Sequence, residues 1–236
     1  MQRKKTILIT GAGRGIGFAL SKVLAESGHK IIMTARDITK LEKRLPEISG
    51  EVIPLKMDVT NIDDIKRAVE EVKKMGHLNV IINNAGGRFD SGDWHEANLE
   101  NPCISEPDEV LKTIDLNLMG PYRVIKYFYP LLDKENRADI INISSGMGGI
   151  AEMGPGSPGY RLSKAGLNAL TSTLSATFEG TKVYVNSFCP GWVRTDLGGM
   201  EATLTPEEGV KGMVWMINDE PDIRGKFLRG QKILNF

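Results

Sequence analysis

Short runs of β-branched and aliphatic residues alternate with helix-length amphipathic segments along the whole chain. The cores of these runs, such as Ile7-Leu8-Ile9, are continuously apolar. Continuous apolar runs are typical of parallel strands covered on both faces, whereas a strand with one solvated face alternates. The predicted strands are Thr6–Thr10, Lys30–Thr34, Glu51–Met57, Asn79–Asn83, Asp139–Ser144, Lys182–Phe188 and a short piece around Lys226–Arg229.

The segments between these strands carry helix signals. Thr60 is predicted to cap a helix entered by Asp63 and Asp64, and Thr205 to cap a helix that starts with proline and two glutamates. Trp215 falls in the apolar stripe of that second helix and is expected in the core. Strands and helices alternating in this way predict an α/β fold, a Rossmann-type doubly wound parallel sheet flanked by helices.

Two long segments interrupt the alternation. Gly86–Pro107 is polar and rich in Gly, Asn and Pro, with Phe89 and Trp94 within it, and Pro190–Leu204 is a second Gly-rich segment that carries Trp192. Both follow strands at their carboxyl ends, where open α/β sheets bind ligands. The aromatic residues are predicted either to wall an apolar substrate pocket or to anchor the loops to the core.

The composition narrows the class of protein. The 236 residues include 30 basic and 30 acidic side chains, so no global field favours nucleic acid or an anionic membrane. No apolar stretch is long enough to cross a bilayer or to form a signal-peptide core. Cys103 and Cys189 do not suggest a disulfide framework, and the scattered histidines do not suggest a metal site. We expect a cytoplasmic, soluble protein whose residues 1–236 form one domain without a metal.

A glycine-rich turn joins the first strand to the first helix. It reads Thr10-Gly11-Ala12-Gly13-Arg14-Gly15-Ile16-Gly17 and precedes an amphipathic helical pattern. Glycines let the backbone approach a pyrophosphate, and the following helix offers free N–H groups and a positive dipole end. At this place in a βαβ unit the turn predicts dinucleotide binding, although glycine also serves turns for conformational reasons alone.

The end of the second strand indicates which nicotinamide cofactor is used. Proteins that bind NAD place an acid there, whereas this strand ends Thr34-Ala35-Arg36. Arg36 and Arg14 are predicted to bind a 2′-phosphate through charge-assisted hydrogen bonds, which favours NADPH over NADH. In the alternative interpretation both arginines are solvated and Asp37 binds a ribose.

The order of the motifs resembles the short-chain dehydrogenase/reductase family nearly from end to end. The matching segments are Thr10–Gly17 for T-G-x-x-x-G-x-G, Asp58-Val59, Asn83–Gly86 for N-N-A-G, Asn117, Asn142–Ser145, Tyr160–Lys164 for Y-x-x-S-K, and Pro190–Thr195 for P-G-x-x-x-T. Within the family, the segments Thr34–Asp37 and Gly191–Asp196 are similar to members of the carbonyl-reductase type.

Tyr160 and Lys164 are four residues apart at the start of a helical pattern, so their side chains share one face. A lysine ammonium beside a tyrosine favours the phenolate, and with the cofactor's help it would lower the tyrosine pKa. Tyr160 is therefore the expected general acid, and Ser145 is expected to donate a hydrogen bond to the same carbonyl oxygen. Because the Ser145–Tyr160 segment is longer than is common in the family, Ser144 or Ser157 is an alternative for that role.

The resemblance implies further roles for named residues. Asn117, just before Gly120-Pro121, would hold a water that relays protons to Lys164, while the residues alone suggest a helix break. Thr195 and the backbone near Gly191 would hold the nicotinamide carboxamide. The catalytic set is Ser145, Tyr160, Lys164 and Asn117. The cofactor-binding set is Gly11, Gly13, Arg14, Gly15, Ile16, Gly17, Arg36, Asp58, Val59, Asn84, Ala85, Gly86, Tyr160, Lys164, Pro190, Gly191, Val193 and Thr195.

These features predict an NADPH-dependent oxidoreductase that reduces an aldehyde, ketone or quinone carbonyl. The alternatives are an NADP-binding sensor without turnover and an epimerase or dehydratase of the same family. Neither the small-molecule substrate nor the physiological direction follows from the sequence. The resemblance suggests a homodimer or homotetramer, with a monomer as the alternative, and the apolar helix face Leu167/Leu170/Leu174 suits a core or an interface equally.

Overall fold

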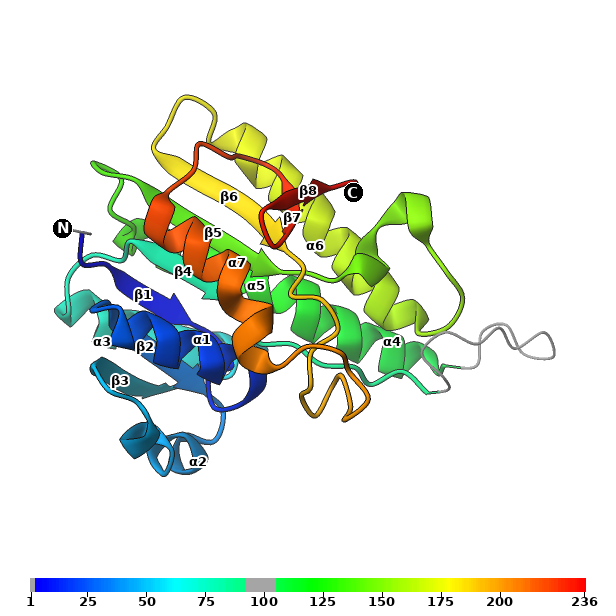
Figure 1. Cartoon of the computed structure of the whole chain (residues 1–236), viewed down its shortest axis with the longest axis horizontal. Coiled ribbons are helices and arrows are strands. Elements are labelled where there is room, and N and C mark those ends of the chain that lie inside the picture. Colours follow the sequence, from blue (N-terminus) through cyan, green and yellow to red (C-terminus); the bar gives the residue numbers. More distant parts are fainter. Residues whose placement is uncertain (1–2, 92–104) are drawn as a thin grey trace.

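The apolar runs form one mainly parallel sheet. In the computed structural model, which describes residues 3–91 and 105–236, eight strands lie in the order β3-β2-β1-β4-β5-β6-β7-β8 (Figure 1). All neighbours are parallel except β7 and β8. The strands are β1 (Thr6–Ile9), β2 (Lys30–Ala35), β3 (Glu51–Lys56), β4 (Val80–Asn83), β5 (Ala138–Ile143), β6 (Val183–Phe188), β7 (Phe227–Arg229) and β8 (Lys232–Leu234).

The predicted strands all form, with each end within one residue of its expected place. The antiparallel edge strand β8 was not predicted. Its residues are mostly exposed, and its pairing with β7 depends on a turn in which Gly230 has a φ of 60°.

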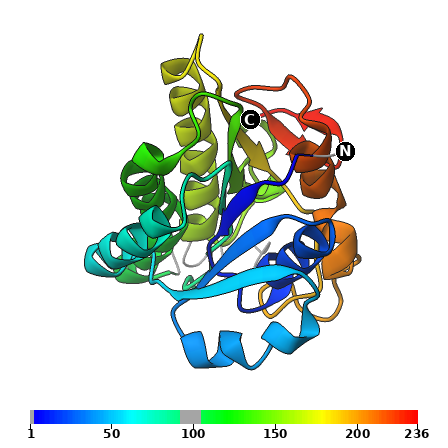
Figure 2. The same cartoon turned by 90° about the vertical axis from the view of Figure 1, so that its left-hand side faces the viewer.

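Helices cover both faces of the sheet, as Figure 2 shows. They are α1 (Gly15–Glu26), α2 (Ile38–Glu42), α3 (Ile62–Lys74), α4 (Pro107–Ile114), α5 (Gly120–Phe128), α6 (Pro158–Thr177) and α7 (Pro206–Asp219). Alternate residues of β1 separate two cores: Ile7 and Ile9 pack with α1 and α7, whereas Leu8 packs with α3 and α5. The structure therefore confirms the doubly wound α/β fold.

The helix caps confirm one prediction and correct another. Thr205 caps α7 in a capping box with Glu208, as its sequence indicates. Asn61, not Thr60, caps α3 by accepting the amides of Asp63 and Asp64. Thr60 instead donates its amide and hydroxyl to the carboxylate of the preceding turn, at 2.9 and 2.7 Å, so it is not available as a cap.

Apolar side chains of α7 and α6 pack against the two cores. Trp215 is half-buried and packs against the core between α1 and α7, as expected. On α6, Leu167 is buried and Leu174 packs against the core beneath α3 and α5, while Leu170 is half-buried. Leu167 and Leu174 thus serve the core.

Candidate active site

The site lies at the carboxyl ends of β1 and β4, where the strand order reverses. The Thr10 hydroxyl accepts the amides of Asn84 and Ala85, each at 3.0 Å. The Asn84 side-chain amide donates back to the carbonyls of Thr10, at 2.8 Å, and Gly11, at 3.0 Å. The glycine-rich turn and the Asn-Asn-Ala-Gly segment are therefore locked into one surface.

Glycine is required in this turn by close packing and by backbone conformation. Gly11 has a φ of +64°, and a Cβ there would lie 2.8 Å from the Ala85 Cα. A Cβ on Gly17 would lie 2.4 Å from the Asn84 Nδ2, and one on Gly15 would lie 3.1 Å from the Thr195 Cγ2. The turn is thus pressed between the loops that follow β4 and β6.

The amino terminus of α1 faces this turn. Among the described residues no side chain caps it, and its first turn contains no acidic residue. Free N–H groups and the positive end of a helix dipole attract phosphate. Together with the glycine-rich cradle, this terminus fits the pyrophosphate of a dinucleotide.

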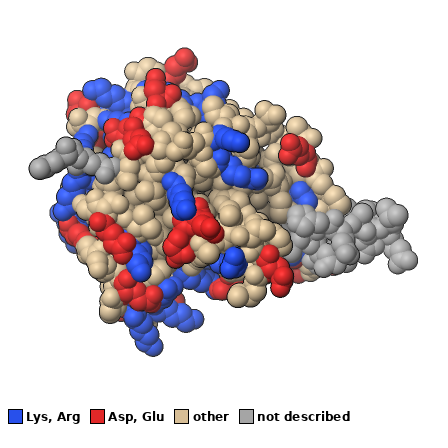
Figure 3. Space-filling view, in the orientation of Figure 1, with Lys and Arg blue, Asp and Glu red and all other residues tan. Residues whose placement is uncertain are grey.

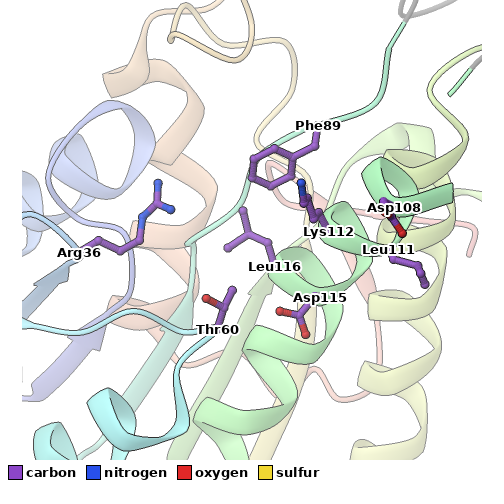
Figure 4. Close-up of a pocket in the computed structure, with 8 residues that line it drawn as sticks. All are labelled: Arg36, Thr60, Phe89, Asp108, Leu111, Lys112, Asp115 and Leu116. Carbon is purple, nitrogen blue, oxygen red and sulfur yellow. The ribbon is translucent and has the colours of Figure 1, made fainter. Parts of the chain in front are cut away.

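A hollow of about 440 Å³ lies beside the cradle, between the ends of β2 and β3 and helix α4 (Figure 4). Arg36 and Thr60 stand on one side of it, with Phe89 and Leu116 near its centre. Its lining combines apolar side chains with charged ones, which fits the adenine ring and the ribose of a dinucleotide's adenosine end. The remaining lining residues are Asp108, Leu111, Lys112 and Asp115.

The two arginines predicted to act together have different surroundings. Arg36 is exposed at the hollow, whereas Arg14 forms an exposed ion pair with Asp196 of the loop after β6. Asp37, the alternative ribose ligand, caps α2 by accepting the Lys40 amide at 3.2 Å. This hydrogen bond lowers the pKa of Asp37, so the side chain is an ionised cap.

The Asp58-Val59 pair directly precedes Thr60, which lines the hollow. The Asp58 carboxylate orders the turn that carries Thr60. The Asp58 backbone amide donates to the Asp64 carboxylate at 3.2 Å. Val59 is buried against Gly120, where a Cβ would lie 2.9 Å from the valine Cγ2. The backbone after β3 is therefore fixed at the edge of the site.

Helix α6 brings the predicted catalytic residues together. The Tyr160 hydroxyl is hydrogen-bonded to the Ser145 side chain. The Lys164 ammonium lies 5.6 Å from the centroid of the tyrosine ring and donates to the Ile143 carbonyl at 2.7 Å. Ser144 instead donates to the Lys164 carbonyl at 3.4 Å. Of the two adjacent serines, Ser145 is thus the one beside Tyr160.

Ser157, the other alternative, is buried at the amino-terminal cap of α6 in a left-handed conformation with a φ of 48°. It is part of the backbone turn into the helix. The structure therefore groups Ser145, rather than Ser157, with the tyrosine and the lysine.

In the protein without a cofactor, burial has the largest effect on the pKa values of Tyr160 and Lys164. It raises the pKa of Tyr160 to about 12, against the opposing effect of the Ser145 hydrogen bond. It also lowers the pKa of Lys164 to about 8. The lysine and a bound cofactor were expected to lower the tyrosine pKa; in the protein without a cofactor the loss of hydration has the largest effect, and the Ser145 hydrogen bond is what opposes it. Tyr160 is consequently a protonated phenol at neutral pH.

Asn117 lies in a widened helical turn. A π-helical turn, Asp115–Met119, joins α4 to α5 at the predicted helix break, so the helix is distorted but continues. The Asn117 side chain accepts the Gly87 amide at 2.9 Å and donates to the Gly87 carbonyl at 2.8 Å and the Ser163 hydroxyl at 3.0 Å. Asn117 thus ties the loop after β4 to α6, and the water relay stays a prediction.

Gly86 connects this arrangement to the cofactor cradle. A Cβ at that position would lie 3.1 Å from the Asn117 Oδ1 and 3.7 Å from the Lys164 ammonium. The absence of a side chain lets the loop backbone pass close to both residues. The second half of the Asn-Asn-Ala-Gly segment is thereby placed against Asn117 and Lys164, two of the predicted catalytic residues.

The loop after β6 is braced internally. Trp192 donates its indole N–H to the Gly198 carbonyl at 2.7 Å, and Thr195 accepts the Gly198 amide at 3.1 Å. Val193 is buried and forms a bridge with Leu204. Gly191, with a φ of +86°, allows the turn after Pro190. The loop is held as a unit above the glycine-rich turn, and the Thr195 methyl faces Gly15 there.

The aromatic residues named in the sequence occupy different places. Trp192 is 54% exposed with its N–H anchored, so its ring is available to a substrate. Phe89 is 46% exposed and lines the hollow on the adenosine side rather than the space near Tyr160. Trp94, like Cys103, lies outside the described residues.

Two site residues have no signal in the sequence pattern. The Arg44 guanidinium stacks 3.5 Å from the Phe18 ring centroid and donates to the Gly13 carbonyl at 3.4 Å, although it lies far from the turn in sequence. Asp90 is buried and accepts the Tyr160 amide at 2.7 Å. Only chain folding brings these pairs together, so no local motif could identify them.

Charged side chains of both signs are mixed on one face of the molecule. Lys and Arg lie interspersed with Asp and Glu on the face in Figure 3. Within the described residues, no helix combines the length and apolarity needed to cross a membrane. The same residues contain no group of three or more His, Cys, Asp or Glu side chains arranged to hold a metal.

Comparison with known proteins places this site in a family. A model of the short chain dehydrogenase family matches residues 5–204. The chain is 34% identical over 206 residues to 3-oxoacyl-[acyl-carrier-protein] reductase FabG of Thermotoga maritima, covering 82% of this chain and 76% of that protein. It is 29% identical over 256 residues to human carbonyl reductase [NADPH] 1, covering 92% of each.

Solved structures show the same similarity in three dimensions. The Drosophila melanogaster carbonyl reductase Sniffer matches with a TM-score of 0.88 and 28% identity, covering 99% of this chain and 100% of that one. NADPH-bound carbonyl reductase from chicken fatty liver matches with a TM-score of 0.82 and 27% identity, with the same coverage. The chain therefore belongs to the short-chain dehydrogenase/reductase family of oxidoreductases.

Proposed function

We propose that the chain reduces an aldehyde, ketone or quinone to the alcohol with NADPH. The observation that carries this proposal is the contact of the Tyr160 hydroxyl with Ser145, beside Lys164 and next to a cradle that fits a dinucleotide. The bound cofactor would supply a hydride to the carbonyl carbon. Relatives whose names specify NADPH, together with Arg36 at the hollow, support the choice of cofactor.

In this proposal each side chain has one task. Tyr160 gives its proton to the carbonyl oxygen, since a pKa of about 12 keeps the phenol protonated at neutral pH. Ser145 donates a hydrogen bond to the same oxygen as negative charge develops on it. Lys164 holds the nicotinamide ribose, and its ammonium stabilises the phenolate until a proton returns from solvent through the Asn117 side of the site.

Replacement of Tyr160 by phenylalanine tests the proposal because it removes the proton donor and keeps the ring. We expect kcat for carbonyl reduction to fall at least about 100-fold, the lower range for a positioned general acid. NADPH affinity, measured by fluorescence titration, should stay within about twofold of the wild type. The rate is followed as loss of reduced-nicotinamide absorbance with a panel of aldehydes, ketones and quinones.

The same measurements separate the alternatives. Undiminished turnover by Tyr160→Phe would rule out the assigned acid. A wild-type protein that binds NADPH tightly but turns over none of the panel would favour the sensor hypothesis. Interconversion of epimers, or loss of water from a substrate, without net consumption of NADPH would favour the epimerase or dehydratase hypothesis.

A further inference from the structure

The amino terminus of α6 is stabilised from outside the helix. Its cap residue, Ser157, makes no side-chain capping hydrogen bond within the described structure, and Pro158 has no N–H to offer. The Tyr160 amide, at the third helical position, instead donates to the Asp90 carboxylate at 2.7 Å. A carboxylate at this place satisfies a terminal N–H and interacts favourably with the helix dipole.

Asp90 is itself held in place. It is 7% exposed, and its other carboxylate oxygen accepts the Thr113 hydroxyl of α4 at 2.8 Å. The Thr113 hydroxyl also accepts the amide of Phe89 at 3.1 Å. Asp90 thus joins the loop after β4, helix α4 and the first turn of α6 at one point.

The packing around this point requires a glycine before the tyrosine. A Cβ on Gly159 would lie 2.3 Å from the Asp90 Oδ1 and 2.9 Å from the Val110 Cα. The carboxylate therefore presses directly against the helix backbone. This contact leaves the first turn of α6 little room to move.

We infer that Asp90 is a positioning residue for Tyr160: it fixes the backbone of the proton donor and so the place of its hydroxyl beside Ser145. This inference rests on the proposed function, because it assigns the effect to proton transfer by Tyr160. Displacement of a reacting group by about 1 Å can lower a rate about 100-fold. The contact also makes the position of the donor depend on the loop that follows Gly86.

Asp90→Ala tests the inference by removing the acceptor. We expect kcat for carbonyl reduction to fall roughly 10–100-fold, while the dissociation constant for NADPH changes less than about twofold, because Asp90 lies outside the cradle. The solvent deuterium isotope effect on kcat should rise, since proton transfer from a misplaced donor becomes slower. Asp90→Asn keeps an acceptor for the Tyr160 amide, and we expect it to restore most of kcat.

Ser91→Ala is the matched control. Ser91 ties the same loop to α4 through its hydroxyl, which donates to Glu109 at 2.6 Å, and among the described residues it has no hydrogen bond to α6. Equal loss of kcat in Ser91→Ala and Asp90→Ala would overturn the inference, because general loosening of the loop would explain both. Normal kcat in Asp90→Ala would overturn it as well.

Hydrogen exchange provides a readout independent of catalysis. Amides at the start of α6 should exchange at least about tenfold faster in Asp90→Ala than in Ser91→Ala, and unchanged exchange would overturn the inference. If Asp90→Ala does not fold, Thr113→Val, which removes the hydroxyl that orients the carboxylate, should show the same pattern more weakly. If Tyr160→Phe retains turnover, the proposed function fails while the exchange result still decides whether Asp90 holds the helix.

Discussion

At the scale of the residue, burial and a few close contacts determine what each polar group can do. Tyr160 and Lys164 are removed from water together, so that the phenol pKa rises and the ammonium pKa falls. Near the predicted cofactor site, Arg14 and Arg36 differ in their surroundings. Arg14 is paired with Asp196, whereas Arg36 is exposed at the hollow, so a cofactor phosphate would depend mainly on Arg36.

Arg36→Ala should therefore weaken NADPH much more than NADH. A charge-assisted hydrogen bond contributes about 1.5–3 kcal/mol, which corresponds to a rise in the NADPH Michaelis constant of roughly 10–100-fold. The NADH constant should change less than about twofold. Lys43→Ala, on an exposed cation near the end of α2, is the control and should leave both constants unchanged. A similar rise for both cofactors in Arg36→Ala would contradict the assignment of Arg36 to the 2′-phosphate.

At the scale of the element, caps and close approaches decide how the helices carry the site. Asp90 holds the start of α6, the π-helical turn before α5 presents Asn117, and Thr205 starts α7. Helix α7 packs against α1, whose amino terminus faces the cofactor cradle. The stability of α7 is thus coupled to the support beneath the cradle.

Thr205→Ala removes the capping-box hydroxyl, which accepts the Glu208 amide at 3.2 Å. We expect the free energy of unfolding to fall by about 1 kcal/mol and Tm to fall by about 2–4 °C. Thermal denaturation followed by circular dichroism measures the effect. Thr203→Ala, two residues earlier on an exposed side chain, should stay within about 0.5 kcal/mol of wild type. Equal destabilisation by both variants would show that the cap contributes nothing specific.

At the scale of the whole molecule, the burial of Lys164 reduces the stability of the fold. The pKa of Lys164 is about 8 in the folded protein and about 10.4 in an unfolded chain. The folded state therefore disfavours the ammonium. The penalty is therefore absent above the unfolded pKa, grows as pH falls between the two values and is complete below about 8.

Lys164→Met should consequently stabilise the protein at neutral pH while abolishing carbonyl reduction. We expect a gain of roughly 1–3 kcal/mol in the free energy of unfolding at pH 7, reduced by the lost hydrogen bond to Ile143. Urea denaturation should show a smaller difference from wild type at pH 10, where the folded-state amine is neutral and the unfolded-state amine has begun to lose its proton. Lys66→Met, on an exposed lysine of α3, should show no such pH dependence. A variant less stable than wild type by the same amount at both pH values would contradict this account.

The amino-acid sequence by itself determined the sheet, the glycine-rich turn and the grouping of Tyr160 with Lys164. These depend on short-range periodicity: continuous apolar runs report strands covered on both faces, and residues four apart share a helix face. Edge strand β8 was missed because its mostly exposed residues carry no apolar run, and its pairing depends on the turn at Gly230. The cap of α3 was misplaced by one residue because Thr60 and Asn61 have similar capping preferences, and only the local turn selects between them.

Only the tertiary structure decided which serine faces Tyr160, where Arg14 and Arg36 point, and that Asp90 caps α6. Each of these depends on contacts between residues far apart in the chain, such as the 70 positions that separate Asp90 from Tyr160. Burial, which sets the pKa values of Tyr160 and Lys164, likewise arises only when the loops and helices enclose the site. Local pattern specifies which elements form, whereas the chemistry of the site depends on what packing places around each group.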